Sequence, residues 1–167
     1  MDPGCTVCLS SFRNQLKNTD FINSHAVYIM LYVIKNDDGT PKFRNSELLA
    51  NYYYALLLSG TGEKSPYHGL SLKLINRLYT GQSQDGQGYQ YLFDNVYDNA
   101  AAEKTIKSWL KEWKLTDAQI ETITKKASSD EVKNHINKIR EKIETEIKPK
   151  GIPTMLYNGT KHLGLYK

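Results

Sequence analysis

Hydrophobic residues recur at helical spacing along most of the chain. Leu9, Phe12 and Leu16 lie on one face of residues 9–18, which predicts a short helix near the N-terminus. Residues 47–59 (ELLANYYYALLLS) are apolar nearly all round, as is typical of a helix buried on every side. Further helices are expected over residues 70–79 and 89–97, around residues 106–113, after the Thr116 capping box and after Ser129.

Two segments carry a strand pattern instead. Residues 26–34 (AVYIMLYVI) form a continuous apolar run rich in β-branched and aromatic side chains, as in a parallel strand that helices cover on both faces. Near the C-terminus, residues 154–157 and 161–166 flank Asn158-Gly159, the pair preferred in a two-residue hairpin turn. The order helix, buried strand, helical block and hairpin predicts an α/β fold with the helical block inserted in it.

Composition adds little to this outline. The 167 residues are 40% hydrophobic and 24% charged, which fits one globular domain. The net charge of +4 is spread along the chain without a run of Lys and Arg, so a nucleic-acid partner is not indicated. No apolar stretch is long enough for a transmembrane helix, so insertion into a membrane is not indicated either.

The only two cysteines, Cys5 and Cys8, lie three positions apart immediately before the first predicted helix. As a structural cross-link the pair would contribute little, because the stabilisation grows with the length of the loop that a disulfide closes. A pair at this spacing can instead close and reopen while the fold stays intact, which favours redox chemistry. Two unrelated core cysteines, or half of a metal site, are the alternatives. The four histidines follow no spacing that predicts a closed zinc site, whereas two thiolates suit copper(I).

Three stretches of the chain resemble motifs of the DsbA-like thiol:disulfide oxidoreductases, which have the thioredoxin fold. Residues 2–8 (DPGCTVC) are similar to the D-P-x-C-x-x-C active-site motif, residues 113–119 (WKLTDAQ) to the end of the family's helical domain, and residues 151–159 (GIPTMLYNG) to its G-[TV]-P-T-x-x-x-N-G motif. The resemblance implies an α/β, thioredoxin-like fold with a large helical insertion. Its thioredoxin-like part would comprise residues 1–45 and 148–167, and its inserted helical domain residues 46–147.

The two thiols have different expected roles. Cys5 lies where the N-terminus of a helix favours negative charge, so it would be the nucleophile, and Cys8, one turn further in, would be the shielded resolving thiol. The resemblance implies a cis peptide bond before Pro153, which would lie beside the Cys5–Cys8 disulfide. Main-chain groups next to it would pair with an extended polypeptide substrate. The expected neighbours of the disulfide are Thr6, Val7 and Pro153, and the expected substrate-binding residues are Ile152 and Thr154.

The sequence therefore predicts an enzyme, a thiol:disulfide oxidoreductase that exchanges disulfides with cysteine-containing polypeptides. It would need no cofactor or metal beyond its own redox-active disulfide, and a redox partner protein would regenerate the pair. Thr6 and Val7 offer neither imidazole nor proline, so we expect a less oxidising couple than in the strongly oxidising members of the family. A non-catalytic binding protein with a thioredoxin fold, or a chaperone that handles copper(I) or thiols, is the alternative.

Both ends of the sequence are shorter than the resemblance leads us to expect. Only four residues precede Cys5, too few for the strand that precedes the cysteines in the thioredoxin fold, and none follows Lys167 to form the last helix. The sheet would therefore be incomplete at the N-terminus. We expect a longer protein with an upstream strand and a secretory signal, acting in the periplasm or another extracytoplasmic compartment.

Overall fold

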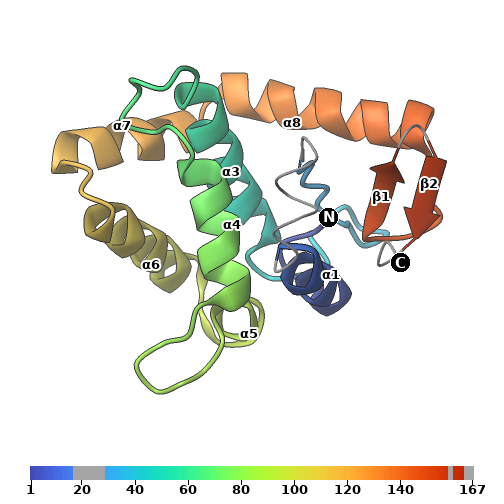
Figure 1. Ribbon diagram of the computed structural model, residues 1–167, viewed down its shortest axis with the longest axis horizontal. Helices are drawn as coiled ribbons and strands as arrows, with labels where there is room; N and C mark the ends of the chain where they lie inside the picture. The colour runs from blue at the N-terminus through green and yellow to red at the C-terminus, as the bar shows by residue number, and fades with distance from the viewer. Residues whose placement is uncertain (17–28, 158–159, 164–167) are drawn as a thin grey trace.

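The computed structural model describes residues 1–16, 29–157 and 160–163, and most of this part of the chain is helical (Figure 1). No helix within it is long and apolar enough to cross a membrane. The helices are α1 (Thr6–Leu16), α3 (Ser46–Ser59), α4 (Leu70–Thr80), α5 (Tyr89–Tyr91), α6 (Asn99–Glu112), α7 (Asp117–Ala127) and α8 (Asp130–Lys142), and two π-helical turns, η1 (Leu92–Val96) and η2 (Ile143–Ile147), extend α5 and α8.

Local side chains fix the beginnings of the later helices. The Thr116 hydroxyl accepts the N–H of Gln119 at 3.3 Å, and the N–H of Thr116 donates to Oε1 of Gln119 at 2.8 Å, so the predicted capping box is confirmed. Ser129 caps α8 by accepting the N–H of Val132, again as predicted. Asp98, which the helical periodicity did not single out, caps α6 in the same way.

The sheet in the described residues is a single antiparallel hairpin. Its strands are β1 (Thr154–Tyr157) and β2 (Thr160–Leu163), with Thr154 opposite Leu163 and Tyr157 opposite Thr160. The hairpin therefore occurs where its two apolar segments predicted it. The predicted Asn158-Gly159 turn and residues 164–166 lie outside the described residues.

The predicted α/β, thioredoxin-like fold is wrong, because the structure is mostly helical and has no larger sheet in the described residues. Of the predicted buried strand, residues 26–28 lie outside the described part. Residues 29–34 belong to neither a strand nor a helix. Their apolar pattern indicated burial, and Leu31 and Val33 are buried while the other four are half-buried, but a sheet also requires neighbouring strands.

The N-terminal main chain and side chains from distant helices take the place of those neighbouring strands along residues 29–34. The N–H of Tyr32 donates to the carbonyl of Met1 at 2.7 Å. The Tyr54 hydroxyl accepts the N–H of Leu31 at 2.9 Å and donates to the carbonyl of Leu31 at 3.0 Å. The Arg140 guanidinium donates to the carbonyl of Val33 at 3.1 Å. Because α3, α8 and the first two residues of the chain supply these partners, the main chain is bonded without a sheet.

Helix α3 lies at the centre of the core. It packs against α4, α7 and α8, and its three consecutive tyrosines are buried. Figure 1 shows α3 and α4 side by side, with α8 running across the top of the view towards the hairpin. One hydrophobic cluster extends from these helices to Cys5, Cys8 and Phe12. The thiol pair is thus packed against the same core as the central helices.

Candidate dithiol site

The two cysteines lie at the N-terminus of α1. The carbonyl of Cys5 accepts the first helical hydrogen bond, from the N–H of Leu9 at 3.1 Å, so Cys5 occupies the N-cap position. Its sulfur accepts the N–H of Cys8 at 3.3 Å, which is the bond that an N-cap side chain makes to the third residue of a helix. Both cysteines are free thiols, and the helix brings them together as the sequence predicted.

The environments of the two thiols differ. Both are buried, but Cys5 is 7% exposed and Cys8 is completely buried. Burial raises the pKa of Cys8 to about 12; its hydrogen bond to the side chain of Cys5 also raises the pKa, and a hydrogen bond with the backbone of Asp2 lowers it. Cys8 therefore keeps its proton at neutral pH, as suits a resolving thiol. Thr6 and Val7, the expected neighbours, are both exposed between the two cysteines.

Asp2 places a fully buried carboxylate three residues before Cys5. It accepts the N–H of Gly4 at 2.9 Å, the N–H of Ile34 at 2.6 Å and the hydroxyl of Ser46. Burial raises the pKa of Asp2, and these three hydrogen bonds oppose the rise. The carboxylate thus joins the residues before the thiols to the extended segment and to the start of α3.

The residues immediately before Cys5 also bond two side chains from α4 and α5. The Tyr79 hydroxyl donates to the carbonyl of Asp2 at 2.9 Å, and the same carbonyl accepts the N–H of Cys5 at 3.1 Å. Nε2 of Gln90 donates to the carbonyl of Gly4. The sequence analysis missed Tyr79 and Gln90, because nothing in their local pattern distinguishes them from packing residues.

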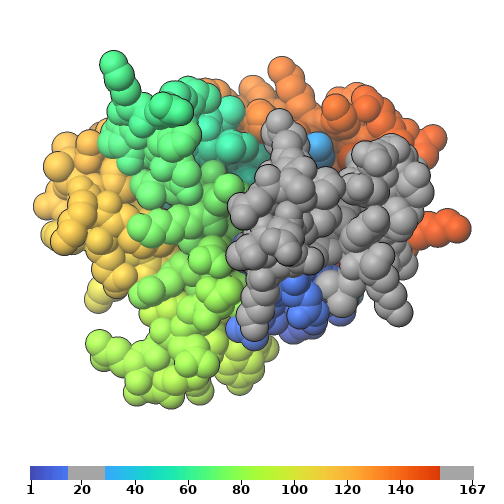
Figure 2. All heavy atoms as spheres, in the orientation of Figure 1, coloured from blue at the N-terminus to red at the C-terminus, as the bar shows by residue number. Residues whose placement is uncertain are grey.

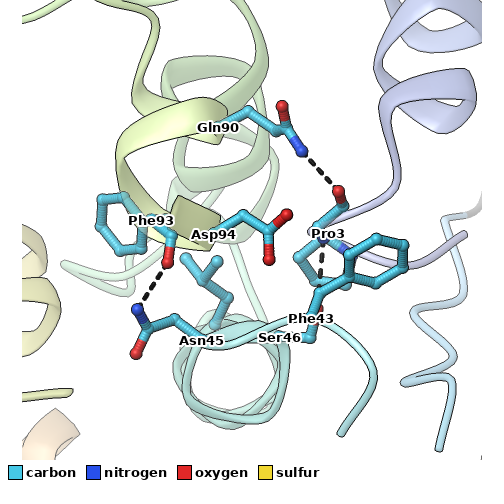
Figure 3. A pocket seen from close by; sticks show the side chains of 9 residues that line it. Pro3, Phe43, Asn45, Ser46, Gln90, Phe93 and Asp94 are labelled. Atoms are coloured by element: carbon cyan, nitrogen blue, oxygen red, sulfur yellow. Dashed lines mark hydrogen bonds between the residues drawn. The ribbon is translucent and has the colours of Figure 1, made fainter. Parts of the chain in front are cut away.

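Position 4 requires a glycine because Phe43 lies very close to it. A Cβ atom on Gly4 would lie 2.2 Å from Cβ of Phe43, well inside van der Waals contact. Figure 3 shows the hollow beside this contact, with Gln90 and Ser46 approaching Pro3 from different helices. Side chains fill the hollow so closely that even a water molecule has no room in it, so it is a packing feature and not a ligand site.

The predicted substrate-binding segment has one of its expected features. The peptide bond between Ile152 and Pro153 is cis, which confirms that prediction. Ile152 packs against the hydrophobic cluster that contains both cysteines, Pro153 is buried, and Thr154 is half-buried and donates to the carbonyl of Gly151. No hydrogen bond among the described residues links residues 151–154 to the thiols, so their place beside the disulfide stays a prediction.

Metal binding has no further support from the arrangement of side chains. Within the described ranges, no three His, Cys, Asp or Glu side chains are grouped as metal ligands are. A copper(I) ion held by two thiolates would use Cys5 and Cys8 alone, and that alternative stays untested.

Comparison of the chain with protein-family models, with curated proteins and with solved structures found no match. The resemblance to the DsbA-like oxidoreductases therefore stays a prediction, and the thioredoxin-like fold that it implied is corrected by the helical structure. What the fold and the site define is a helical protein with an N-capping thiol and a buried second thiol one turn away.

Proposed function

We propose that the protein is a thiol:disulfide oxidoreductase that exchanges disulfides with cysteine-containing polypeptides through Cys5 and Cys8. The observation that supports this proposal most directly is the inequality of the two thiols. The Cys5 sulfur caps the helix and accepts a backbone N–H, while Cys8 is buried and holds its proton. A nucleophilic thiol beside a shielded one is the arrangement that two-step exchange requires.

The oxidising reaction has two exchange steps. A substrate thiolate attacks the Cys5 sulfur of the Cys5–Cys8 disulfide, forming a mixed disulfide, and Cys8 leaves and takes up a proton. A second substrate thiolate then attacks the substrate sulfur of the mixed disulfide, and Cys5 leaves. The substrate gains a disulfide and the protein becomes a dithiol, which a redox partner protein reoxidises. No cofactor beyond the disulfide takes part, and reduction of a substrate reverses the steps.

The position of Cys5 suits it to attack and to departure. Thiolates, and not thiols, react with disulfides, so groups that favour the anion also favour the reaction. At the N-terminus of α1, backbone N–H groups and the helix dipole both favour negative charge, and the N–H of Cys8 already points at the Cys5 sulfur. Because Cys8 has a raised pKa, it stays protonated until the mixed disulfide brings it into reaction.

The surface around Cys5 can accept a polypeptide chain. Val7 is 57% exposed and Thr6 is also exposed, so an apolar side chain stands at the surface next to the capping sulfur. Figure 2 shows some atoms of the N-terminal part of the chain, in blue, at the surface of the molecule. Ile152 and Thr154 complete the proposed substrate-binding residues, and an extracytoplasmic compartment suits a disulfide-exchanging protein.

The proposal is tested by equilibrating the protein with glutathione and then following turnover of a reduced, unfolded substrate protein. The wild type should form a reversible Cys5–Cys8 disulfide and oxidise the substrate, and Cys5→Ser should do neither. Ser10→Ala, a change at an exposed position in α1, is the control and should match the wild type. If the wild type and Cys5→Ser are equally inert, the protein is not an oxidoreductase and the non-catalytic binding alternative is favoured.

A further inference from the structure

Three helices each direct one buried polar side chain at the three residues that precede Cys5. We call residues 2–4 the lead. The side chains are Ser46 at the start of α3, Tyr79 at the end of α4 and Gln90 in α5, and they are 1%, 0% and 6% exposed. Together they form what we call the polar clamp. All three belong to helices remote in sequence from the thiols.

The clamp holds the main chain of the lead from several sides. Ser46 accepts the N–H of Gly4 at 3.2 Å and donates to the Asp2 carboxylate. Tyr79 donates to the carbonyl of Asp2 at 2.9 Å, and Gln90 donates to the carbonyl of Gly4. Buried polar atoms are costly unless they are paired, so each of these bonds favours one position of the lead.

Tyr79 contacts α1 as well as the lead. Its ring packs on Phe12 with 5.1 Å between centroids, and its carbonyl accepts Nε of Arg13 at 2.7 Å. The end of α4 therefore contacts the chain both before and after Cys5 and Cys8. Any displacement of the lead relative to α1 would break bonds to Tyr79 on one side or the other.

We propose that Ser46, Tyr79 and Gln90 are positioning residues that set the equilibrium between the dithiol and disulfide forms of the pair. The inference rests on the proposed function. In the dithiol, the bond from the N–H of Cys8 to the Cys5 sulfur, the packing of both thiols in the core and the clamp fix the two sulfurs relative to each other. In the disulfide, a covalent bond fixes them. Loss of the clamp therefore destabilises the dithiol more than the disulfide.

The equilibrium that measures this effect is exchange with glutathione. The protein dithiol reacts with one oxidised glutathione to give the protein disulfide and two reduced glutathione molecules, so the two thiol protons of the protein pass to glutathione. Tyr79→Phe removes only the hydroxyl and keeps the ring on Phe12. Gln90→Met keeps the length of the side chain and removes the donor. Each variant should shift this equilibrium about three- to tenfold towards the protein disulfide, the range expected for one net hydrogen bond.

The matched control is Tyr52→Phe. It makes the same chemical change in a buried tyrosine of α3, whose hydroxyl bonds Glu103 at 2.8 Å and Thr124 at 3.1 Å and does not contact the lead. Its glutathione equilibrium should equal that of the wild type. If Tyr79→Phe and Tyr52→Phe agree within about twofold, below the effect of one net hydrogen bond, the clamp proposal is overturned.

Failure of the clamp and failure of the proposed function give different results. If the wild type forms no Cys5–Cys8 disulfide at any glutathione ratio, the proposed function fails. The clamp is then judged by the rate at which iodoacetamide alkylates Cys8, which is completely buried in the intact arrangement. A clamp predicts several-fold faster alkylation in Tyr79→Phe than in Tyr52→Phe, and equal rates would contradict it.

Discussion

The central helices and the N-terminal part of the molecule satisfy their backbone polar groups in different ways. In α3 to α8 the main chain bonds within each helix, and local caps such as Ser129 complete the ends. The lead and residues 29–34 instead bond side chains that come from distant helices, and residues 29–34 also bond the main chain of Met1. The comparison implies that the helices depend on the volume of buried side chains, whereas the thiol region depends on a few polar atoms.

The largest effect on stability is expected from a loss of volume in the helices. Ile123 is fully buried in α7, which packs against α3, so Ile123→Ala should lower the free energy of unfolding by about 2–5 kcal/mol. Urea denaturation of the reduced protein measures this loss. The glutathione equilibrium of the folded variant should stay at the wild-type value, and a shift in it would contradict the separation between the two parts.

The second-largest loss of stability is expected when a buried hydrogen-bond acceptor is removed from the thiol region. Asp2→Ala leaves the N–H of Ile34 and the hydroxyl of Ser46 without their acceptor, whereas the N–H of Gly4 keeps its second acceptor, Ser46; the substitution should lower the free energy of unfolding by about 3 kcal/mol. Asp38 is the control, because it is a carboxylate that accepts two hydrogen bonds from Thr40 but is exposed. Asp38→Ala should lower the free energy of unfolding much less in the same urea titration. Equal losses would show that burial of the Asp2 carboxylate is unimportant.

Close packing of the lead predicts an intolerance to one added methyl group. Gly4→Ala should lower the free energy of unfolding by about 1–3 kcal/mol, because the new Cβ would overlap Phe43. Gly88→Ala is the control, since no atom lies within 4 Å of its added Cβ and its backbone is extended. Thermal unfolding should therefore be shifted by Gly4→Ala alone. Similar melting temperatures for the two variants would mean that Phe43 moves aside freely.

The smallest expected effect is a dependence of stability on pH. Burial raises the pKa of Cys8 to about 12 from an ordinary value of 9.0, so the folded protein keeps a proton that the unfolded chain loses. Stability should therefore fall as the pH rises above about 9. Between pH 9 and about pH 10 the reduced wild type should lose more stability than Cys8→Ala, because both proteins contain the same tyrosines and differ only in the thiol. Parallel curves would contradict the burial of Cys8.

The same contrast explains what the sequence could predict of the fold. Helical periodicity and caps are local, so α3, α4 and the capping box at Thr116 could be identified from residues that are neighbours along the chain. The apolar run at residues 29–34 indicated burial, but its partners include Tyr54 and Arg140 from remote helices and the first two residues of the chain. A local pattern cannot show whether a strand or a side chain will satisfy a buried backbone.

In the candidate site, too, local features could be predicted from the sequence and long-range contacts could not. Cys5 and Cys8 could be placed at a helix start because their spacing is local, and the cis bond before Pro153 was implied by a motif resemblance. The burial of Asp2 and its bonds to the clamp depend on how α3, α4 and α5 pack around the lead. Those contacts join residues that are far apart in sequence, so no spacing or composition signals them.

The most direct test of the central claim, that Cys5 attacks and Cys8 resolves, is the intact mass of two single-cysteine variants after exposure to oxidised glutathione. Cys8→Ser retains the capping thiol and should quickly gain one glutathione as a mixed disulfide that cannot resolve. Cys5→Ser retains only the buried thiol with the raised pKa and should stay largely unmodified at neutral pH. Equal labelling of the two variants, or faster labelling of Cys5→Ser, would contradict the account.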